Sequence, residues 1–360
     1  MKKILFAIAA VATLASCAKS EVEYVQAEAQ IAISPVAANR TKAMVSGTEF
    51  PAENFMVWAY YKQLTAPTSI EAWQTSTEAQ QTYINEKPFQ PSGTSGLWAG
   101  VTPYYWPKLG SLLFVGYYPA TDAMAAKVSY EFTSSVNKMT VDGFTPGDYQ
   151  TTGFVNNATG ANHVEDFMYF NMTPSSCDGS TVGAENSVTT GYQIDVHFRH
   201  ALSWISVVLA KDANTPEKAT ITVKSVTFTD VKTTGTGIVD NSPVAPNTNE
   251  IAWETTDAKT DVNVWTGEKV LGAAETLEKQ PVIIPQGMAG NLVVTYVVSS
   301  EDGSSFEETK TVALASINSE NPNWKPGQKY TYTITIGTSE ILIDPSIVDW
   351  APVTPSLPIQ

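Results

Sequence analysis

The sequence predicts an all-β protein made of two consecutive antiparallel β-sandwich domains. Thr, Ser, Val, Gly, Pro and Asn are abundant, while Lys, Glu and Leu are sparse, and this composition suits strands and turns better than long helices. Short apolar segments of strand length recur along the chain between Gly, Pro and Asp residues. The 360 residues are many for one sandwich and sufficient for two domains of ordinary size.

The chain begins with the pattern of a bacterial signal peptide. Two lysines precede an apolar run over residues 4–13, which is too short to cross a bilayer as a permanent helix. Leu14-Ala15-Ser16-Cys17 follows and resembles the lipobox of bacterial lipoproteins. The resemblance implies cleavage of residues 1–16, lipidation of the Cys17 thiol, and a short tether over residues 17–23. The alternative is an ordinary signal peptide in which Cys17 is incidental.

Apolar and polar side chains alternate through residues 24–34. This period of two predicts a strand with one buried side, and we expect Pro35 to end it. The predicted buried face consists of Val25, Ala27, Ala29, Ile31 and Ile33. Residues 36–48 are small and polar and are predicted to form a loop, in which Arg40 is the only arginine. The pattern therefore predicts a first strand joined to the rest of the chain by an open loop.

The first domain is expected to span residues 24–185. After the first strand, it contains further predicted strands at residues 54–61, 98–101, 104–106, 112–118, 128–132 and 138–141. A weak helical pattern occupies residues 69–81. The polar stretch at 173–190 marks the predicted domain boundary, although a long internal loop would have the same composition.

The second domain is expected to span residues 186–350 and is followed by a proline-rich tail over residues 351–360. Its predicted strands lie at residues 192–198, 202–209, 221–228, 262–265, 282–284, 292–298, 310–312 and 330–336. Glu301-Asp302-Gly303 has the Asp-Gly chemistry of a tight hairpin.

Charge and cysteine content limit the possible partners and cross-links. The chain has 36 acidic and 21 basic residues, which gives a formal charge of -15. A field of this sign repels nucleic acid, so no nucleic-acid partner is expected. If Cys17 is acylated, Cys177 has no cysteine left to pair with inside the chain.

No motif for catalysis, a metal or a cofactor is visible in the sequence. His197 and His200 lie in a predicted strand, and residues three apart point to opposite faces, so their imidazoles cannot share a metal. Tryptophans such as Trp98 and Trp106 could stack on sugars, but aromatic residues of strands are more often part of the core. We therefore predict that the protein is not an enzyme and has neither cofactor nor metal.

Seven short motifs share the order and spacing of one family of bacterial surface proteins. They are Phe55–Tyr61 (FMVWAYY), Thr102–Pro107 (TPYYWP), Leu113–Pro119 (LFVGYYP), Glu165–Tyr169 (EDFMY), Phe198–Ile205 (FRHALSWI), Trp324–Tyr332 (WKPGQKYTY) and Val348–Trp350 (VDW). In these motifs the chain resembles the fimbrillin-like lipoproteins of Bacteroidales bacteria, the type V pilins, almost to its C-terminus.

The resemblance implies two transthyretin-like sandwich domains and a route of assembly. In that route the lipoprotein is exported to the outer surface and cut after an arginine, here between Arg40 and Thr41. The cut releases the first strand, and the terminal strand of a neighbouring subunit fills the groove. Removal of a strand exposes unpaired backbone groups and apolar surface that recruit another strand.

The tail departs from the pattern expected of a donor strand. Val353, Pro355, Leu357 and Ile359 alternate with polar residues and with Pro358, as a donor should. Pro352, Pro355 and Pro358 lack N–H groups, however, so a strand paired on both sides would lose hydrogen bonds. A tip subunit, an anchor subunit or a non-polymerising lipoprotein therefore also fits.

The sequence favours a structural or adhesive pilus subunit on the cell outer membrane or in the fimbrium. Its expected partners are other pilin subunits through strand exchange, the outer membrane through the lipid, and a surface ligand on host or bacterium. The alternative is a non-polymerising surface lipoprotein that binds glycan, and an enzyme with scattered acids ranks third. Burial of Trp98 and Trp106 would favour the pilin, and a row of exposed tryptophans would favour glycan binding.

Overall fold

A computed structural model describes most of the chain from residue 30 to residue 349. The described residues are 30–37, 53–64, 70–94, 96–107, 110–146, 154–156, 166–171, 175–176, 193–243, 250–319, 322–338 and 341–349. Strands dominate these ranges, which confirms the all-β prediction. The helices described are short: α1 (Ile70–Thr75), α2 (Asp122–Ala125) and α3 (Leu314–Ile317). Within these ranges, no helix has the length and apolar character that a membrane span requires.

Several predicted features lie outside the described residues: Cys17, Cys177, Arg40, Thr41, Val25, Ala27, Ala29 and the tail over residues 351–360.

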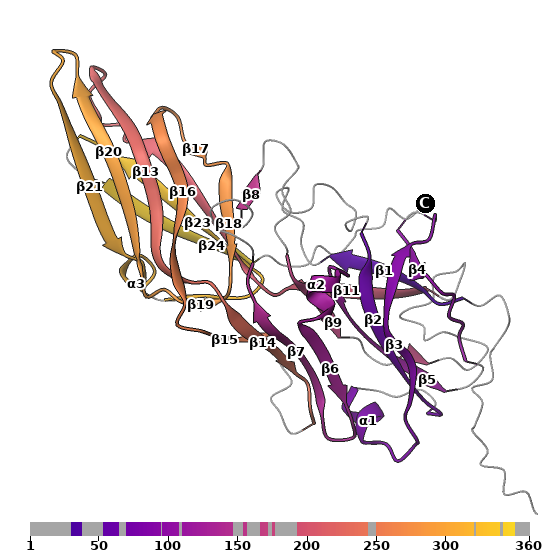
Figure 1. The fold of residues 1–360 in the computed structure, drawn as a ribbon. Helices are drawn as coiled ribbons and strands as arrows, with labels where there is room; N and C mark the ends of the chain where they lie inside the picture. The colour runs from indigo at the N-terminus through magenta and orange to yellow at the C-terminus, as the bar shows by residue number, and fades with distance from the viewer. Residues whose placement is uncertain are drawn as a thin grey trace, which may run out of the picture.

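The N-terminal strands form one sheet that closes on itself, drawn in indigo and magenta in Figure 1. Its order is β10-β5-β2-β3-β4-β1-β11-β9, and β9 also pairs with β5, which joins the two ends. The strands are β1 (Ala32–Ala37), β2 (Phe55–Lys62), β3 (Gln81–Pro91), β4 (Trp98–Gly100), β5 (Ser111–Tyr118), β9 (Met168–Asn171), β10 (Ser175–Ser176) and β11 (Gln193–His200). We call this assembly the closed sheet.

Side chains fill both faces of the closed sheet. One face carries a cluster that includes Ile33, Phe55, Phe114, Trp106 and Phe198. The other face packs against a second sheet of order β15-β14-β7-β6, made of β6 (Val128–Phe132), β7 (Asn137–Phe144), β14 (Gly235–Asp240) and β15 (Ala252–Thr255). Phe114 and Trp58, which lie in strands predicted to be apolar on both sides, are both buried as expected.

The C-terminal strands, together with β8, form a two-sheet sandwich, which we call the C-terminal sandwich. One sheet has the order β24-β23-β12-β18-β8 and the other β16-β13-β20-β21. The strands are β8 (Phe154–Asn156), β12 (Ser203–Lys211), β13 (Ala219–Lys232), β16 (Lys259–Val270), β17 (Glu275–Thr276), β18 (Lys279–Ile283), β20 (Asn291–Ser300), β21 (Ser305–Ala313), β23 (Gln328–Ile336) and β24 (Ile341–Asp349). A small separate pair joins β19 (Gln286–Gly287) to β22 (Asn323–Trp324).

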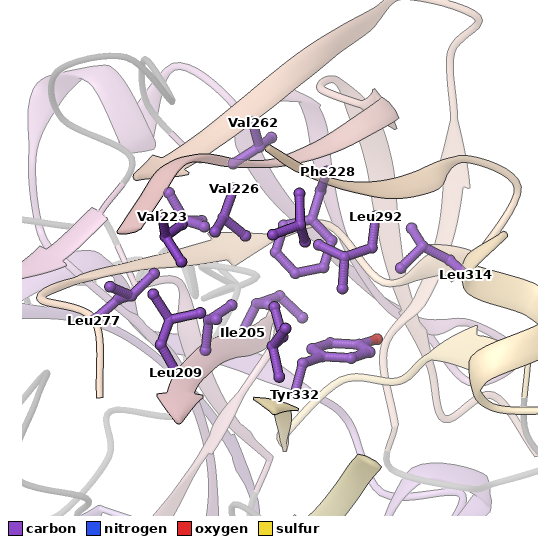
Figure 2. Packing of buried hydrophobic residues seen from close by; sticks show 14 of the residues in the cluster. Ile205, Leu209, Val223, Val226, Phe228, Val262, Leu277, Leu292, Leu314 and Tyr332 are labelled. Carbon is purple, nitrogen blue, oxygen red and sulfur yellow. The ribbon is translucent and has the colours of Figure 1, made fainter. Parts of the chain in front are cut away.

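The core of the C-terminal sandwich lies between its two sheets. Ile205 and Leu209 from β12 and Tyr332 from β23 meet Val226 and Leu292 from the facing sheet (Figure 2). Gly303 has φ +84 in the turn between β20 and β21, which confirms the hairpin predicted from Asp-Gly.

A continuous two-stranded ribbon connects the C-terminal sandwich to the sheets beside it. β13 pairs with β16, and β14, which follows β13, pairs with β15, which precedes β16. Backbone bonds from Thr233 N to Ala258 O (3.1 Å) and from Thr256 N to Thr234 O (2.8 Å) bridge the two ladders. The ribbon therefore contributes to the cores of both halves of the molecule.

The domain boundary expected between residues 185 and 186 lies outside the described residues. Pairings nevertheless connect the segments on its two sides. β11 and β14 follow it in sequence but pair with β1 and β7, whereas β8 precedes it and pairs with β18. A single division of the chain at this point does not separate the sheets.

Three local features differ from expectation. Pro35 was expected to end the first strand, but it lies inside β1. Two ladders, β1–β11 and β12–β23, are parallel. The helical pattern at 69–81 forms only α1, which ends at Thr75. Alternation within one segment shows neither a strand's partners nor their direction, and these depend on tertiary contacts.

Candidate functional site

The first strand lies inside the closed sheet with a neighbour on each side. On one side it runs parallel to β11, from Ala32 opposite Gln193 to Ala37 opposite Phe198. On the other side it is antiparallel to β4, with Ile33 opposite Trp98. Just before β1, Ile31 N donates to Tyr104 O at 2.8 Å. Removal of β1 would therefore open the closed sheet and leave two unpaired edges.

The inward face of this strand belongs to the core. Ile31 and Ile33 are 0% exposed, as the alternating pattern predicted, and Pro35 on the same face is also buried. Their cluster includes Ile194 and Val196 of β11. Fully burying an aliphatic side chain of this size contributes about 1.5–3 kcal/mol. A groove left by β1 would therefore be apolar as well as rich in unpaired backbone groups.

Pro35 is accommodated because its nitrogen faces the side of β1 that has no described neighbour at that level. The Ile31 N–H points toward Tyr104, and N–H groups of alternate residues in a strand point the same way. Pro35 therefore directs its nitrogen toward the β4 side, where the β4 ladder ends at Ile33. No ladder bond is lost there, so the groove accepts a proline at this position.

Trp98 and Trp106 belong to the core beside this strand and not to the surface. Trp98 is 6% exposed, and its Nε1 donates to Glu53 O at 3.2 Å. Trp106 is 0% exposed and lies edge-on to Phe114, with ring centroids 5.9 Å apart. Neither ring is exposed enough to stack on a sugar. Of the two functions weighed from the sequence, pilin subunit and glycan-binding lipoprotein, this burial favours the pilin subunit.

Two adjacent tyrosines at the end of β5 donate hydrogen bonds to carboxylates. Tyr117 donates to Glu86 Oε1 at 3.0 Å, and Tyr118 donates to Glu53 Oε2 at 2.8 Å. Burial, followed by the nearby carboxylate charge and hydrogen bond, raises the pKa of both phenols well above the usual value. Both tyrosines therefore act as neutral hydrogen-bond donors near neutral pH.

The structure pairs one of the two strand histidines with an acid that the sequence did not link to it. His200 Nδ1 lies 2.6 Å from Asp166 Oδ2, and both side chains are buried. His197 is exposed, so the two imidazoles point to opposite faces as predicted. Across the described ranges, no group of three or more His, Cys, Asp or Glu residues could hold a metal.

The comparison with family models assigns the chain. The model described as fimbrillin-like matches residues 58–350, which is most of the sequence. The chain belongs to the fimbrillin-like family. Its membership rests on a match that includes the closed sheet from β2 onward and the whole C-terminal sandwich. No curated protein matches the chain.

Solved structures of Bacteroidales proteins resemble this fold at low identity. A fimbrial protein from Bacteroides vulgatus is 16% identical, with a TM-score of 0.52 and coverage of 89% of this chain and 99% of that one. A proposed cell adhesion protein from Bacteroides uniformis is 15% identical, with a TM-score of 0.48 and coverage of 91% and 100%. The tip fimbrial protein Mfa3 from Porphyromonas gingivalis is 11% identical, with a TM-score of 0.38 and coverage of 89% and 100%.

Proposed function

We propose that this member of the fimbrillin-like family is a structural or adhesive subunit of a type V pilus, without catalytic activity. The observation that carries the proposal is the position of β1. It is the first strand described, it completes a closed sheet, and the sequence that follows it carries a single arginine before residue 48. A strand in this position can be removed by one cut and replaced by a strand from a neighbouring subunit.

The anchor in this proposal is the lipid on Cys17. Each buried methylene of an acyl chain contributes about 0.8 kcal/mol, so several chains together hold a protein firmly on a membrane. The proposed location is the cell outer membrane, surface-exposed, and then the fimbrium. Cys17→Ala should release the protein from the membrane fraction or leave an uncut precursor. Membrane retention of this variant after a high-salt wash, together with no palmitate label in the wild type, would contradict the anchor.

The proposed processing step is cleavage between Arg40 and Thr41. It would separate the first strand, with Val25, Ala27, Ala29, Ile31 and Ile33 on its inward face, from the rest of the chain. The inward face includes two small alanines, which lowers the apolar area that release must expose.

The proposed partner is another pilin subunit whose terminal strand fills the groove. The tail of this chain has features of such a strand. Val353-Thr354-Pro355 has the same order of side-chain types as Ile33-Ser34-Pro35 in β1: β-branched, hydroxyl, proline. With Pro355 at the position of Pro35, the nitrogen would face the side that lacks a described neighbour. Pro352 and Pro358, each three residues from Pro355, would turn their nitrogens toward β11 and would each lose a bond there, so the tail fits a donor role at Pro355 and less well at the other two prolines.

We also infer that the molecule has two domains that exchange strands across the boundary near residue 185. The N-terminal domain (24–185) takes in β11, β14 and β15 from the second half of the sequence, while β8 joins the C-terminal domain (186–350). These pairings across the boundary within one chain support a subunit in which the two domains bear force as one unit.

The decisive experiment compares Arg40→Ala with Lys42→Ala. The Lys42 variant removes a neighbouring charge and leaves the arginine site intact. An arginine-specific protease should expose Thr41 as the new N-terminus in the wild type and in Lys42→Ala. Both should then form oligomers, whereas Arg40→Ala should stay monomeric by size-exclusion chromatography with light scattering. Correct cleavage without any oligomer would overturn strand exchange between copies, and oligomers of uncut Arg40→Ala would overturn the processing step.

A further inference from the structure

Buried polar side chains gather at one end of the core between the closed sheet and the sheet of β6, β7, β14 and β15. Gln74 of α1 is 0% exposed, Asn137 at the start of β7 is 1% exposed, and Asn241 just after β14 is 2% exposed. We call these three residues the amide cluster. Three primary amides within an otherwise aromatic and aliphatic core need hydrogen-bond partners.

The charged neighbour of the amide cluster is fully satisfied. Lys62 Nζ donates to Trp73 O at 2.8 Å and to Gln74 O at 2.9 Å. It also contacts Ser76 O at 3.2 Å and Ser76 Oγ at 3.1 Å. Lys62 therefore holds the end of α1 in place and has no proton left for the amides.

The amide of Gln74 is only half satisfied. Its Nε2 donates to Thr133 O at 2.6 Å and to Val136 O at 2.8 Å, which fixes the side chain against the turn before β7. Its Oε1 has no partner in the part of the chain that the structure describes. The Gln74 amide is thus held beside Val136, the residue before Asn137, with its oxygen left for another partner.

Asn137 and Asn241 face each other at the end of the β7–β14 ladder. Asn241 N donates to Asn137 O at 2.8 Å, which extends the register that pairs Asp240 with Lys138. Asn137 Oδ1 accepts from the Tyr130 hydroxyl at 2.7 Å, but its Nδ2 has no partner. Neither Nδ2 nor Oδ1 of Asn241 has a partner among the described residues.

The unpaired atoms of the amide cluster are therefore two amide nitrogens, which donate, and two amide oxygens, which accept. Exchanging the nitrogen and oxygen of either asparagine changes which atom is unpaired but not the number. A metal cation would be repelled by the amide N–H groups, and an anion would be repelled by the oxygens. Water both donates and accepts, so it is the ligand that matches the set.

We propose that the amide cluster is an internal hydration site that binds ordered water. The water joins three segments that are distant in sequence: the end of α1, the start of β7 and the residue after β14. It thereby connects α1 to one end of the sheet of β6, β7, β14 and β15. This site is independent of the pilus function, because it lies on the opposite face of the closed sheet from the β1 side chains.

The test combines a high-resolution crystal structure with water-to-amide cross-relaxation NMR of the full chain. In the wild type, we expect density for water within hydrogen-bond distance of Gln74 Oε1 and Asn137 Nδ2, and long-lived water cross-peaks at the Asn137 and Asn241 side-chain amides. In Asn241→Leu, which fills the site with apolar atoms, the cross-peaks at Asn137 should disappear. The exposed residue Asn214 gives the control, and Asn214→Ala should retain them.

Two results would overturn the proposal. One is a direct hydrogen bond between the amides of Asn137 and Asn241 without water density in the wild type. The other is retention of the Asn137 water cross-peaks in folded Asn241→Leu. If Asn241→Leu fails to fold, the wild-type density and cross-peaks decide the matter alone.

Discussion

The first and last strands that the structure describes, β1 and β24, differ in how they are held. β1 lies inside the closed sheet, with β11 on one side and β4 on the other, and its inward isoleucines are fully buried. β24 pairs only with β23 among the described strands. Its inward residues Ile341, Ile343 and Ile347 are only partly buried. These two strands therefore make unequal contributions to the core.

This difference bears directly on strand exchange. Loss of β1 breaks the closure of a sheet and exposes the Ile31 and Ile33 surface, whereas loss of β24 would leave the sheet of β23 and β12 intact. A site that stays closed until a cut is made, and becomes strongly binding afterwards, suits controlled assembly. β24 has none of these properties, so the groove of the proposed strand exchange is the one that β1 fills.

Both strands carry a proline whose nitrogen faces an unpaired side. Asp212 N donates to Ile336 O at 2.9 Å, so the Ile336 carbonyl points toward β12. Backbone groups of alternate residues point the same way, so those of Tyr332 also point toward β12. Pro345 lies opposite Tyr332, and its backbone nitrogen therefore points away from β23. A proline on a free edge removes a donor from it and discourages pairing with other chains.

The edge strand of the facing sheet is protected in another way. β21 carries Glu308 and Lys310 on the face that Tyr296 and Val294 turn to the core. Glu308 accepts from the Tyr296 hydroxyl at 2.8 Å and pairs with Lys310 at 2.5 Å. Inward-pointing charges make an edge a poor template for a further strand.

The largest expected effect comes from truncating matched isoleucines in the two strands. Ile33→Ala should lower the free energy of unfolding by about 2–5 kcal/mol, because it leaves a cavity in a closed core. Ile343→Ala should cost about 1 kcal/mol, because its side chain is partly exposed and solvent can fill the space. Urea unfolding followed by tryptophan fluorescence measures both. Equal losses would remove the distinction between an enclosed and an edge strand.

A smaller effect is expected from titration of buried phenols. Burial raises the pKa of Tyr60 in β2 to about 12, and burial together with Glu308 raises the pKa of Tyr296 to about 12. The unfolded phenol loses its proton near pH 10. Between these values the folded state binds more protons, so the stability present below pH 10 is lost progressively as the pH rises through 12.

Tyr60→Phe and Tyr296→Phe should each reduce this alkaline loss of stability. Glu308→Gln should lower the pKa of Tyr296 and leave that of Tyr60 unchanged, because only Tyr296 contacts this carboxylate. Phenolate absorbance against pH, with urea unfolding at each pH, measures the shift. Ionisation of both phenols near pH 10 in the folded protein would show that burial does not protect them.

Sequence patterns correctly predicted the features that depend on residues close together in the chain. The alternation before Pro35 predicted the burial of Ile31 and Ile33, and Asp302-Gly303 predicted the hairpin between β20 and β21. The pattern did not show that β1 runs parallel to β11 or that β5 meets β9, because these pairings join distant segments.

The prediction that the first strand ends at Pro35 was wrong for a related reason. A proline stops a ladder only where its nitrogen would face a partner, and at Pro35 the β4 ladder has already ended. The His200–Asp166 pair and the amide cluster also depend on chain segments brought together by the fold. Neither has a local sequence signal.

The smallest expected change in stability comes from Pro345→Val. This variant tests whether the missing N–H of Pro345 keeps other chains from pairing with the edge of β24. Restoring an N–H on the free edge of β24 should promote self-association, with a change in stability within about 1 kcal/mol. Ser346→Val is the matched control, because it adds an apolar side chain on the exposed face and leaves Pro345 in place. Sedimentation velocity over a range of concentrations should show oligomers of Pro345→Val and monomers of Ser346→Val. Equal association of the two variants would mean that apolar area, and not the missing donor, controls this edge.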